Sequence, residues 1–172
     1  ASKWRTPVER FLGIHGLFLF IIATFLIYRT RGVLWSVARS LVPWAPGVIE
    51  PAGGVTDRAV QLSWLKVGLG LGLLLAVLLG VAGYWTAVVL LVFLMLVGMA
   101  AWDVLTSQGE DRPFAAVPLV LLGMALAIAI GVDFVRVEGD IGRMNTFFKY
   151  YLEVWVLLSI VSAYMLWHLG RH

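Results

Sequence analysis

Residues 67–102 read VGLGLGLLLAVLLGVAGYWTAVVLLVFLMLVGMAAW, a stretch in which no side chain is charged. As one helix, these 36 residues would be about 54 Å long at about 1.5 Å per residue, whereas the hydrocarbon core of a bilayer is about 30 Å thick. The stretch therefore predicts two membrane-spanning helices, at 62–82 and 85–103. Gly83-Tyr84-Trp85 marks the turn between them, because Gly tolerates turn conformations and aromatic side chains favour the headgroup level.

The composition of the whole chain agrees with this stretch. Of 172 residues, 61% are hydrophobic and 13% are charged, and the mean hydropathy is +0.93. Since about a quarter of the residues of a soluble domain are charged, a soluble fold is excluded. The net charge is +3, and the charged residues lie almost wholly between the apolar runs. This distribution is typical of membrane-flanking charge and not of a nucleic-acid surface. The absence of cysteine excludes disulfides and thiolate metal sites.

Three further apolar runs predict spans at 11–28, 114–132 and 150–169. The predicted fold class is therefore all-α, a polytopic transmembrane bundle of five spans in a single transmembrane domain, 1–172. An odd number of spans places the two termini on opposite sides of the membrane. Lys and Arg do not fix the orientation, because one side holds six of them and the other seven.

The first span has a recognisable start. Thr6-Pro7-Val8-Glu9 matches a capping box with Pro at the first helical position. We expect the helix to begin at Pro7, with the Thr6 hydroxyl on backbone amides of its own first turn.

A second kind of helix is predicted after the first span. Residues 32–42 divide into an apolar arc and a polar arc on a helical wheel, and they are too short and too polar to cross a bilayer. This pattern is typical of an amphipathic helix that lies in the membrane interface. We expect it to end at Pro43 and Pro46, since proline cannot continue a helix.

The candidate site lies before and within the last span. Seven charged side chains fall between residues 133 and 153, a density that is costly near lipid unless the groups pair or face a polar cavity. Asn145, Lys149 and Glu153 recur at helical spacing, so a helix would align them on one stripe, which we expect to point inward. Cationic side chains and free helix amides suit a phosphate. The residues predicted to bind a lipid phosphate are Arg136, Arg143, Asn145, Lys149 and Glu153. The alternative is an interfacial belt of salt bridges that anchors the last span.

Other polar residues have simpler interpretations beside functional ones. His15 lies in the first span between two glycines, where it could be an axial ligand of a chlorin or haem, or a hydrogen-bonded packing residue. His168 is interpreted as interfacial. Asp103 is interpreted as a residue at a span end, with a metal-binding or base role as the alternative. Gly68 and Gly72 would allow close helix contact. We predict no cofactor and no metal site, since no His or acidic cluster has ligand spacing.

Two segments resemble a known family. Residues 143–155, RMNTFFKYYLEVW, preceded by 139–142, GDIG, resemble the signature of the YYY family of polytopic membrane proteins from Chloroflexi and archaea. Residues 11–20, FLGIHGLFLF, resemble an upstream segment of the same family. The resemblance implies a distant kinship with GT-C glycosyltransferases, which take sugars from polyprenyl-phosphate donors and use an acidic residue in an early loop. It also implies that this chain is a portion of a longer architecture in a prokaryotic cell membrane.

Two functions of different classes follow. The first is a non-catalytic or partly catalytic portion of a GT-C-like glycosyltransferase, because the first loop offers only Glu50 and Asp57 without an acidic pair. The second is a non-enzymatic accessory subunit of a larger membrane complex, such as a photosynthetic or respiratory one. The expected partners are the lipid bilayer, a polyprenyl-phosphate lipid and other membrane subunits, and no nucleic acid. A pigment or haem carrier using His15 is the third interpretation.

Overall fold

The structure is a computed structural model that describes residues 6–41, 55–106, 112–134 and 144–171. Within these residues it contains five helices and no strand. All five are long and apolar enough to cross a membrane, which confirms the predicted fold class. The helices are α1 (Val8–Leu41), α2 (Val55–Val81), α3 (Trp85–Thr106), α4 (Arg112–Gly131) and α5 (Met144–Gly170).

The predicted hairpin in the long apolar stretch is confirmed. Helix α2 ends at Val81, and Gly83 has a φ of 82°, a left-handed conformation that suits Gly because it has no Cβ. The Gly83 N–H donates to the Gly80 carbonyl (2.9 Å), and the Tyr84 N–H donates to the Leu79 carbonyl (2.8 Å). This pair of bonds is a Schellman motif, which satisfies the last carbonyls of α2 and releases the chain into α3.

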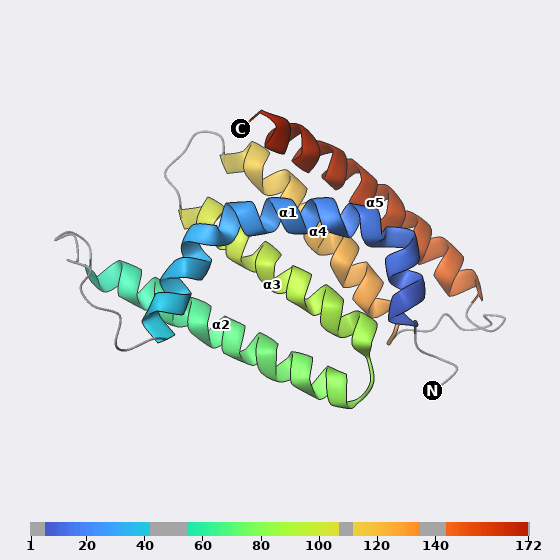
Figure 1. Cartoon of the computed structure of the whole chain (residues 1–172), viewed down its shortest axis with the longest axis horizontal. Coiled ribbons are helices and arrows are strands. Elements are labelled where there is room, and N and C mark those ends of the chain that lie inside the picture. Colours follow the sequence, from blue (N-terminus) through green and yellow to red (C-terminus); the bar gives the residue numbers. More distant parts are fainter. Residues whose placement is uncertain (1–5, 42–54, 107–111, 135–143, 172) are drawn as a thin grey trace.

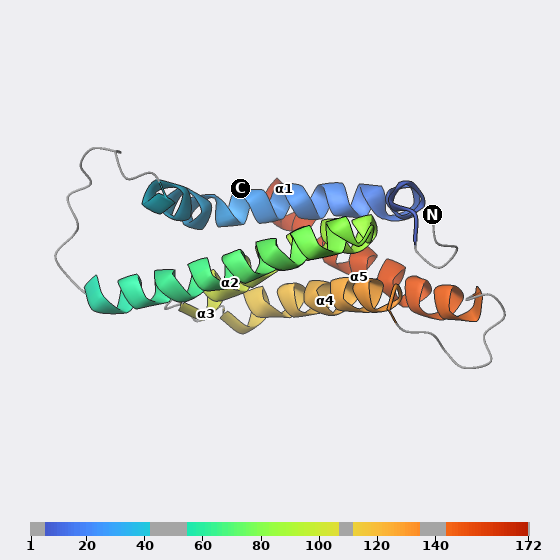
Figure 2. The same cartoon turned by 90° about the horizontal axis from the view of Figure 1, so that it is seen from below.

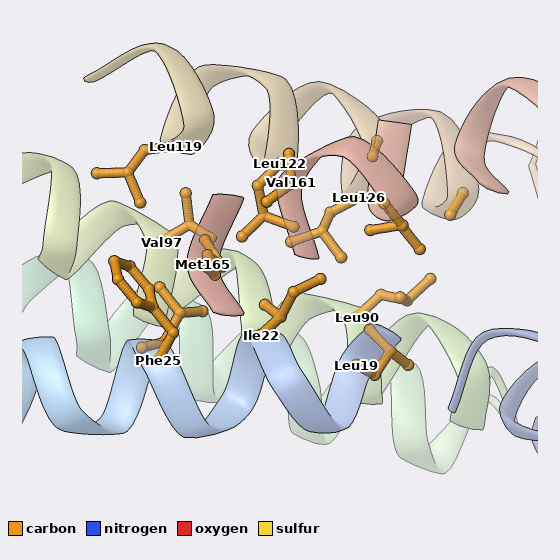
Figure 3. Close-up of a cluster of buried hydrophobic side chains, with 14 of the residues drawn as sticks. Leu19, Ile22, Phe25, Leu90, Val97, Leu119, Leu122, Leu126, Val161 and Met165 are labelled. Carbon is orange, nitrogen blue, oxygen red and sulfur yellow. The ribbon is translucent and has the colours of Figure 1, made fainter. Parts of the chain in front are cut away.

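Four of the helices enclose the core, and the fifth lies outside it. Helices α1, α3, α4 and α5 pack in a cycle in which α1 contacts α3 and α5, while α4 contacts both of these. Figure 3 shows core side chains from these helices interdigitating, among them Ile22, Leu122 and Val161. Helix α2 packs mainly on α3 and lies at the edge of the bundle in Figures 1 and 2. None of the residues in the most apolar window of α2 is buried.

Helix α1 differs from its prediction in one respect. The expected interfacial helix at 32–42 is helical as far as Leu41, but it continues α1 without a break. The helix bends instead of ending: the last part of α1 turns away from the axis of its middle part in Figure 1. The polar residues between the two parts stay helical: the buried Thr30 hydroxyl donates to the Leu26 carbonyl (2.7 Å). Pro43 and Pro46 lie outside the described residues.

The start of α1 and the end of α5 lie at opposite ends of the bundle, as the odd number of spans predicts (Figure 1). The N-terminal end gathers the start of α1, the turn between α2 and α3, the end of α4 and the start of α5. The C-terminal end gathers the end of α3, the start of α4 and the end of α5.

Of the two glycines expected to allow close contact, Gly72 does so, since a Cβ there would lie 2.8 Å from the Met95 sulfur. Gly68 faces open space.

Candidate functional site

Four polar residues from distant parts of the chain meet at the N-terminal end. The Thr6 hydroxyl donates to the Asp133 carboxylate (2.6 Å), and the Thr6 backbone N–H donates to the same oxygen (3.2 Å). The Tyr151 hydroxyl lies 3.0 Å from the Thr6 hydroxyl, and the Thr86 hydroxyl donates to the Thr6 carbonyl (2.7 Å). We call these four residues the Thr6 cluster. It ties the start of α1 to α3, to the turn after α4 and to α5.

Local structure at the helix ends positions this cluster. Asp133 lies just past α4, where its N–H donates to the Ile130 carbonyl (3.1 Å) in a closing turn. The next residue, Phe134, stacks on Tyr84 of the α2–α3 turn with ring centroids 5.0 Å apart. Thr86 is the second residue of α3 and is buried. Asp133 and Thr86 are therefore held by a turn and a helix end, and Tyr151 is held within helix α5.

The expected role of Thr6 as a cap is wrong. Helix α1 begins at Val8, and the Phe11 N–H donates to the Pro7 carbonyl (3.1 Å), so the start lies within one residue of its prediction. The Thr6 hydroxyl, however, donates to Asp133, and within the described residues no N–H of the first turn of α1 donates to it. One Asp133 carboxylate oxygen accepts both the Thr6 hydroxyl and the Thr6 backbone N–H, and hydrogen bonds to a charged acceptor are the stronger kind. Local sequence spacing carries no sign of this partner.

A pocket of about 290 Å³ opens beside the cluster, between α1 and α5. Its size lies near the lower limit of small-molecule pockets, and apolar or aromatic side chains form most of its wall. It is lined by Thr6, Pro7, Arg10, Phe11, Ile14, His15 and Tyr151. We call it the α1–α5 pocket.

His15 forms part of the wall of this pocket. Its ring lies 4.6 Å from that of Phe11 and 5.8 Å from that of Tyr151, centroid to centroid, and the side chain is 1% exposed. The Nδ1 atom is buried and has no hydrogen-bond partner among the described residues. The His15 ring therefore packs against other side chains as expected, but the expected hydrogen bond is not made by Nδ1 within the described residues. Axial ligation of a chlorin or haem stays a prediction.

Two cations lie at the same end. Arg10 is exposed and lines the α1–α5 pocket, one turn before Ile14. Lys149 is exposed on α5, two residues before Tyr151 of the Thr6 cluster. An apolar pocket with a guanidinium at its wall can hold a hydrocarbon chain and an anionic group together.

The predicted inward direction of Lys149 and Glu153 is wrong, because both side chains are exposed. The inward face of α5 consists instead of Val154, Leu158 and Val161, each 0% exposed, at spacings of three and four residues. A stripe through Lys149 and Glu153 lies on another face of the same helix. Their part in binding a phosphate is untested by this geometry.

The other predicted phosphate-binding residues are described only in part. Asn145 lies in the first turn of α5, but its side chain is outside the described residues. Arg136 and Arg143 lie wholly outside them. The segment that carries both arginines connects Phe134 to the start of α5, two points at the N-terminal end. Their role as phosphate ligands stays a prediction.

A second polar group lies towards the C-terminal end. The Arg29 guanidinium of α1 pairs with the Asp103 carboxylate of α3 at 3.6 Å. The sequence interpretation of Asp103 as a residue at a span end missed this partner, and the Asp103 side chain remains 44% exposed. His168 of α5 is half-buried and packs edge-on against Phe25 of α1, with ring centroids 5.4 Å apart. Ionisable groups at this depth usually have a partner or a function.

Comparisons with known proteins place the chain in a family. No curated protein and no solved structure matches it. One family model, described as "Uncharacterized membrane protein (DUF2298)", matches residues 2–158, which include the Thr6 cluster, the α1–α5 pocket and most of every helix. With five helices able to span a membrane and a match over most of its length, this chain belongs to the DUF2298 family of membrane proteins.

Proposed function

We propose that this chain binds a phosphorylated polyprenyl lipid at the N-terminal end of the bundle, as a membrane-embedded portion of a GT-C-like glycosyltransferase in a prokaryotic cell membrane. The observation that carries the proposal is the α1–α5 pocket, which combines apolar walls with the guanidinium of Arg10. Kinship with the YYY family and a longer architecture are parts of the same proposal, supported by the two segments that resemble that family.

The chemistry of the pocket supports this class of ligand. Phe11, Ile14 and Tyr151 offer apolar surface to a hydrocarbon chain, and the bilayer supplies such chains without exposing them to water. Arg10 presents planar N–H donors that match two oxygens of a phosphate. Lys149 adds a second exposed cation at the same end. Arg136 and Arg143 are proposed to add further donors from the segment that joins α4 to α5.

We propose binding and not sugar transfer by this chain alone. A catalytic base must lie within hydrogen-bond reach of the reacting group and be able to accept its proton. Asp133 is the acidic residue of the Thr6 cluster, but its carboxylate already accepts two hydrogen bonds from Thr6. These two hydrogen bonds indicate a structural role for Asp133, which joins the start of α1 to the end of α4. Glu50 and Asp57 are the sequence-predicted candidates for a base: Asp57 lies in the first turn of α2 and not in the loop before it, and both side chains lie outside the described residues.

The experiment is retention of polyprenyl phosphate by the purified chain, measured by native mass spectrometry, together with an assay for transfer from a polyprenyl-phosphate sugar. We expect retention without transfer. Arg10→Gln should lower retention about tenfold, the effect of one lost charge-assisted hydrogen bond. Arg31→Gln is the matched control, since Arg31 is exposed on the same helix and lies over the Tyr28 ring, away from the pocket. Equal retention by the two variants would refute the role of Arg10.

The accessory-subunit function is the second candidate, and the exposure of α2 favours it. No residue of its most apolar window is buried, and Gly68 and Gly70 leave open space beside it. A neighbouring helix could approach such a surface closely. Gly70→Leu should then release a partner from the solubilised native complex without changing retention of the lipid. An unchanged native mass after Gly70→Leu would count against this candidate.

A further inference from the structure

Tyr164 of α5 lines two cavities towards the C-terminal end of the bundle. One is an apolar groove of about 280 Å³ between α4 and α5, lined also by Phe114, Val117, Pro118, Leu121, Ile160 and Val161. The other is a small cavity of about 20 Å³, whose wall includes Arg29 and His168. A hydrocarbon groove and a polar cavity are therefore adjacent, with the Tyr164 side chain common to both.

The groove opens on the face of the bundle that a bilayer would surround. Val117 and Ile160 on its sides are 56% and 54% exposed, whereas Val161 at its base is 0% exposed. Pro118 lies inside α4, where a proline ring cannot fill space as a longer side chain would. The groove is thus a depression in an apolar surface, and its volume of about 280 Å³ suits part of a hydrocarbon chain.

The small cavity supplies charge at one end of this groove. Arg29 reaches it from α1, and its ion pair with Asp103 is long, at 3.6 Å between Nη2 and Oδ2. A guanidinium has five N–H donors, so one such contact leaves donors for another oxygen. The cavity volume is enough for one group of the size of a water molecule or a single oxygen.

The level of this cavity along the bundle also matters. Two arginines near it lie over aromatic rings: Arg31 is 4.7 Å from the Tyr28 centroid, and Arg171 is 4.2 Å from the Trp167 centroid. Arginine and large aromatic side chains concentrate where a membrane protein meets the lipid headgroups. Arg29, two residues before Arg31, therefore lies close to the depth at which lipid phosphates are found.

We infer that the α4–α5 groove binds an acyl chain of an anionic glycerophospholipid whose phosphate contacts Arg29 beside Tyr164. The chain lies against Val117, Pro118 and Val161, and a phosphate oxygen enters the small cavity. Cationic Arg29 selects an anionic headgroup over a zwitterionic one. This site is at the opposite end from the α1–α5 pocket, so it stands or falls separately from the proposed function.

The experiment measures co-purification of phosphatidylglycerol and phosphatidylcholine with the full chain by native mass spectrometry. We expect phosphatidylglycerol to be retained about tenfold better, because both lipids offer a phosphate to Arg29 but the choline cation of phosphatidylcholine is repelled by the guanidinium. Val117→Trp should abolish that preference by filling the groove. Val120→Trp is its control, since Val120 is a neighbouring exposed residue of α4 that does not line the groove.

Two further variants test the headgroup contact. Arg29→Gln should remove the preference for phosphatidylglycerol, whereas Asp103→Asn should increase it, because the guanidinium loses its competing carboxylate. The second variant keeps the test decisive if Arg29→Gln does not fold. Equal retention of the two lipids by the unaltered chain, equal effects of the two tryptophan variants, or a weaker preference in Asp103→Asn would each overturn the inference. Retention of polyprenyl phosphate serves as the independent readout and should not change.

Discussion

Thr6 and Asp133 are 127 positions apart in the chain and are joined by two hydrogen bonds, one from the Thr6 hydroxyl and one from its backbone N–H. Both bonds end on one carboxylate oxygen. This contact fixes the first helix to the end of the fourth, and Tyr151 and Thr86 extend it to the fifth and the third. The N-terminal end of the bundle is therefore closed by polar contacts, whereas its middle is held by apolar packing (Figure 3).

Removing the Thr6 hydroxyl should destabilise the bundle. Thr6→Val leaves the Asp133 carboxylate without its hydroxyl donor, which we expect to cost about 1–3 kcal/mol of unfolding free energy. Thr24→Val is the matched control, because the Thr24 hydroxyl donates only to the Phe20 carbonyl of its own helix (2.9 Å). Unfolding in mixed micelles, followed by circular dichroism, measures both. A loss in Thr24→Val as large as that in Thr6→Val would contradict the special role of the cluster.

The turn between α2 and α3 should be sensitive to a single methyl group. Gly83→Ala places a Cβ on a residue with a φ of 82°, which we expect to cost about 1–2 kcal/mol. Gly98→Ala is the control, because Gly98 is helical in α3 and a Cβ there would meet no atom within 4 Å. The same unfolding measurement applies. Equal stability of both variants would exclude a left-handed Gly83.

The contact between α2 and α3 should depend on Gly72. A Cβ at Gly72 would lie 2.8 Å from the Met95 sulfur. The flexible Met95 side chain can move away from one methyl group. A larger, branched side chain would push the two helices apart. We therefore expect Gly72→Ile to lower the efficiency of a disulfide cross-link engineered between α2 and α3. Gly68→Ile, at a position that faces open space, should leave it unchanged. Loss of the cross-link in both variants would contradict a specific contact at Gly72.

Replacing His15 should separate packing from ligand binding. His15→Phe keeps a ring between Phe11 and Tyr151 and removes a buried nitrogen without a hydrogen bond, so stability should be kept or improved. His15→Ala leaves a cavity and should cost about 3 kcal/mol, as for other large buried rings. An absorption band of the native protein that disappears in His15→Phe would instead identify the axial ligand of a pigment or haem.

The sequence was sufficient for the spans and insufficient for the site, for a physical reason. Long runs without charge, such as residues 67–102, predict helical spans because a helix bonds its backbone groups within one segment, as lipid requires. Which side of a span faces inward is poorly encoded, since the lipid and the protein core are both apolar. On α5, Val154 is buried and Val156 is exposed, although the two side chains are identical. The inward stripe was therefore assigned to the polar residues Lys149 and Glu153, which are exposed.

Contacts between distant segments were beyond sequence reasoning for a different reason. The Thr6-Pro7-Val8-Glu9 pattern has a sufficient local explanation, and a partner 127 residues away leaves no periodic trace. The Arg29–Asp103 pair is hidden in the same way, because each residue alone is typical of the end of a span. The continuity of α1 through Arg31 was missed because polarity was interpreted as a break, whereas Thr30 remains helical by bonding to Leu26.

The Thr6 cluster also implies an order of events during biosynthesis. Thr6 leaves the ribosome 127 residues before Asp133 and 145 residues before Tyr151. The hairpin of α2 and α3 can form as soon as its two neighbouring segments have entered the membrane, because its contacts are local. Helix α1 can therefore pack on α3 early, but it completes its contacts only after α5 has entered the membrane.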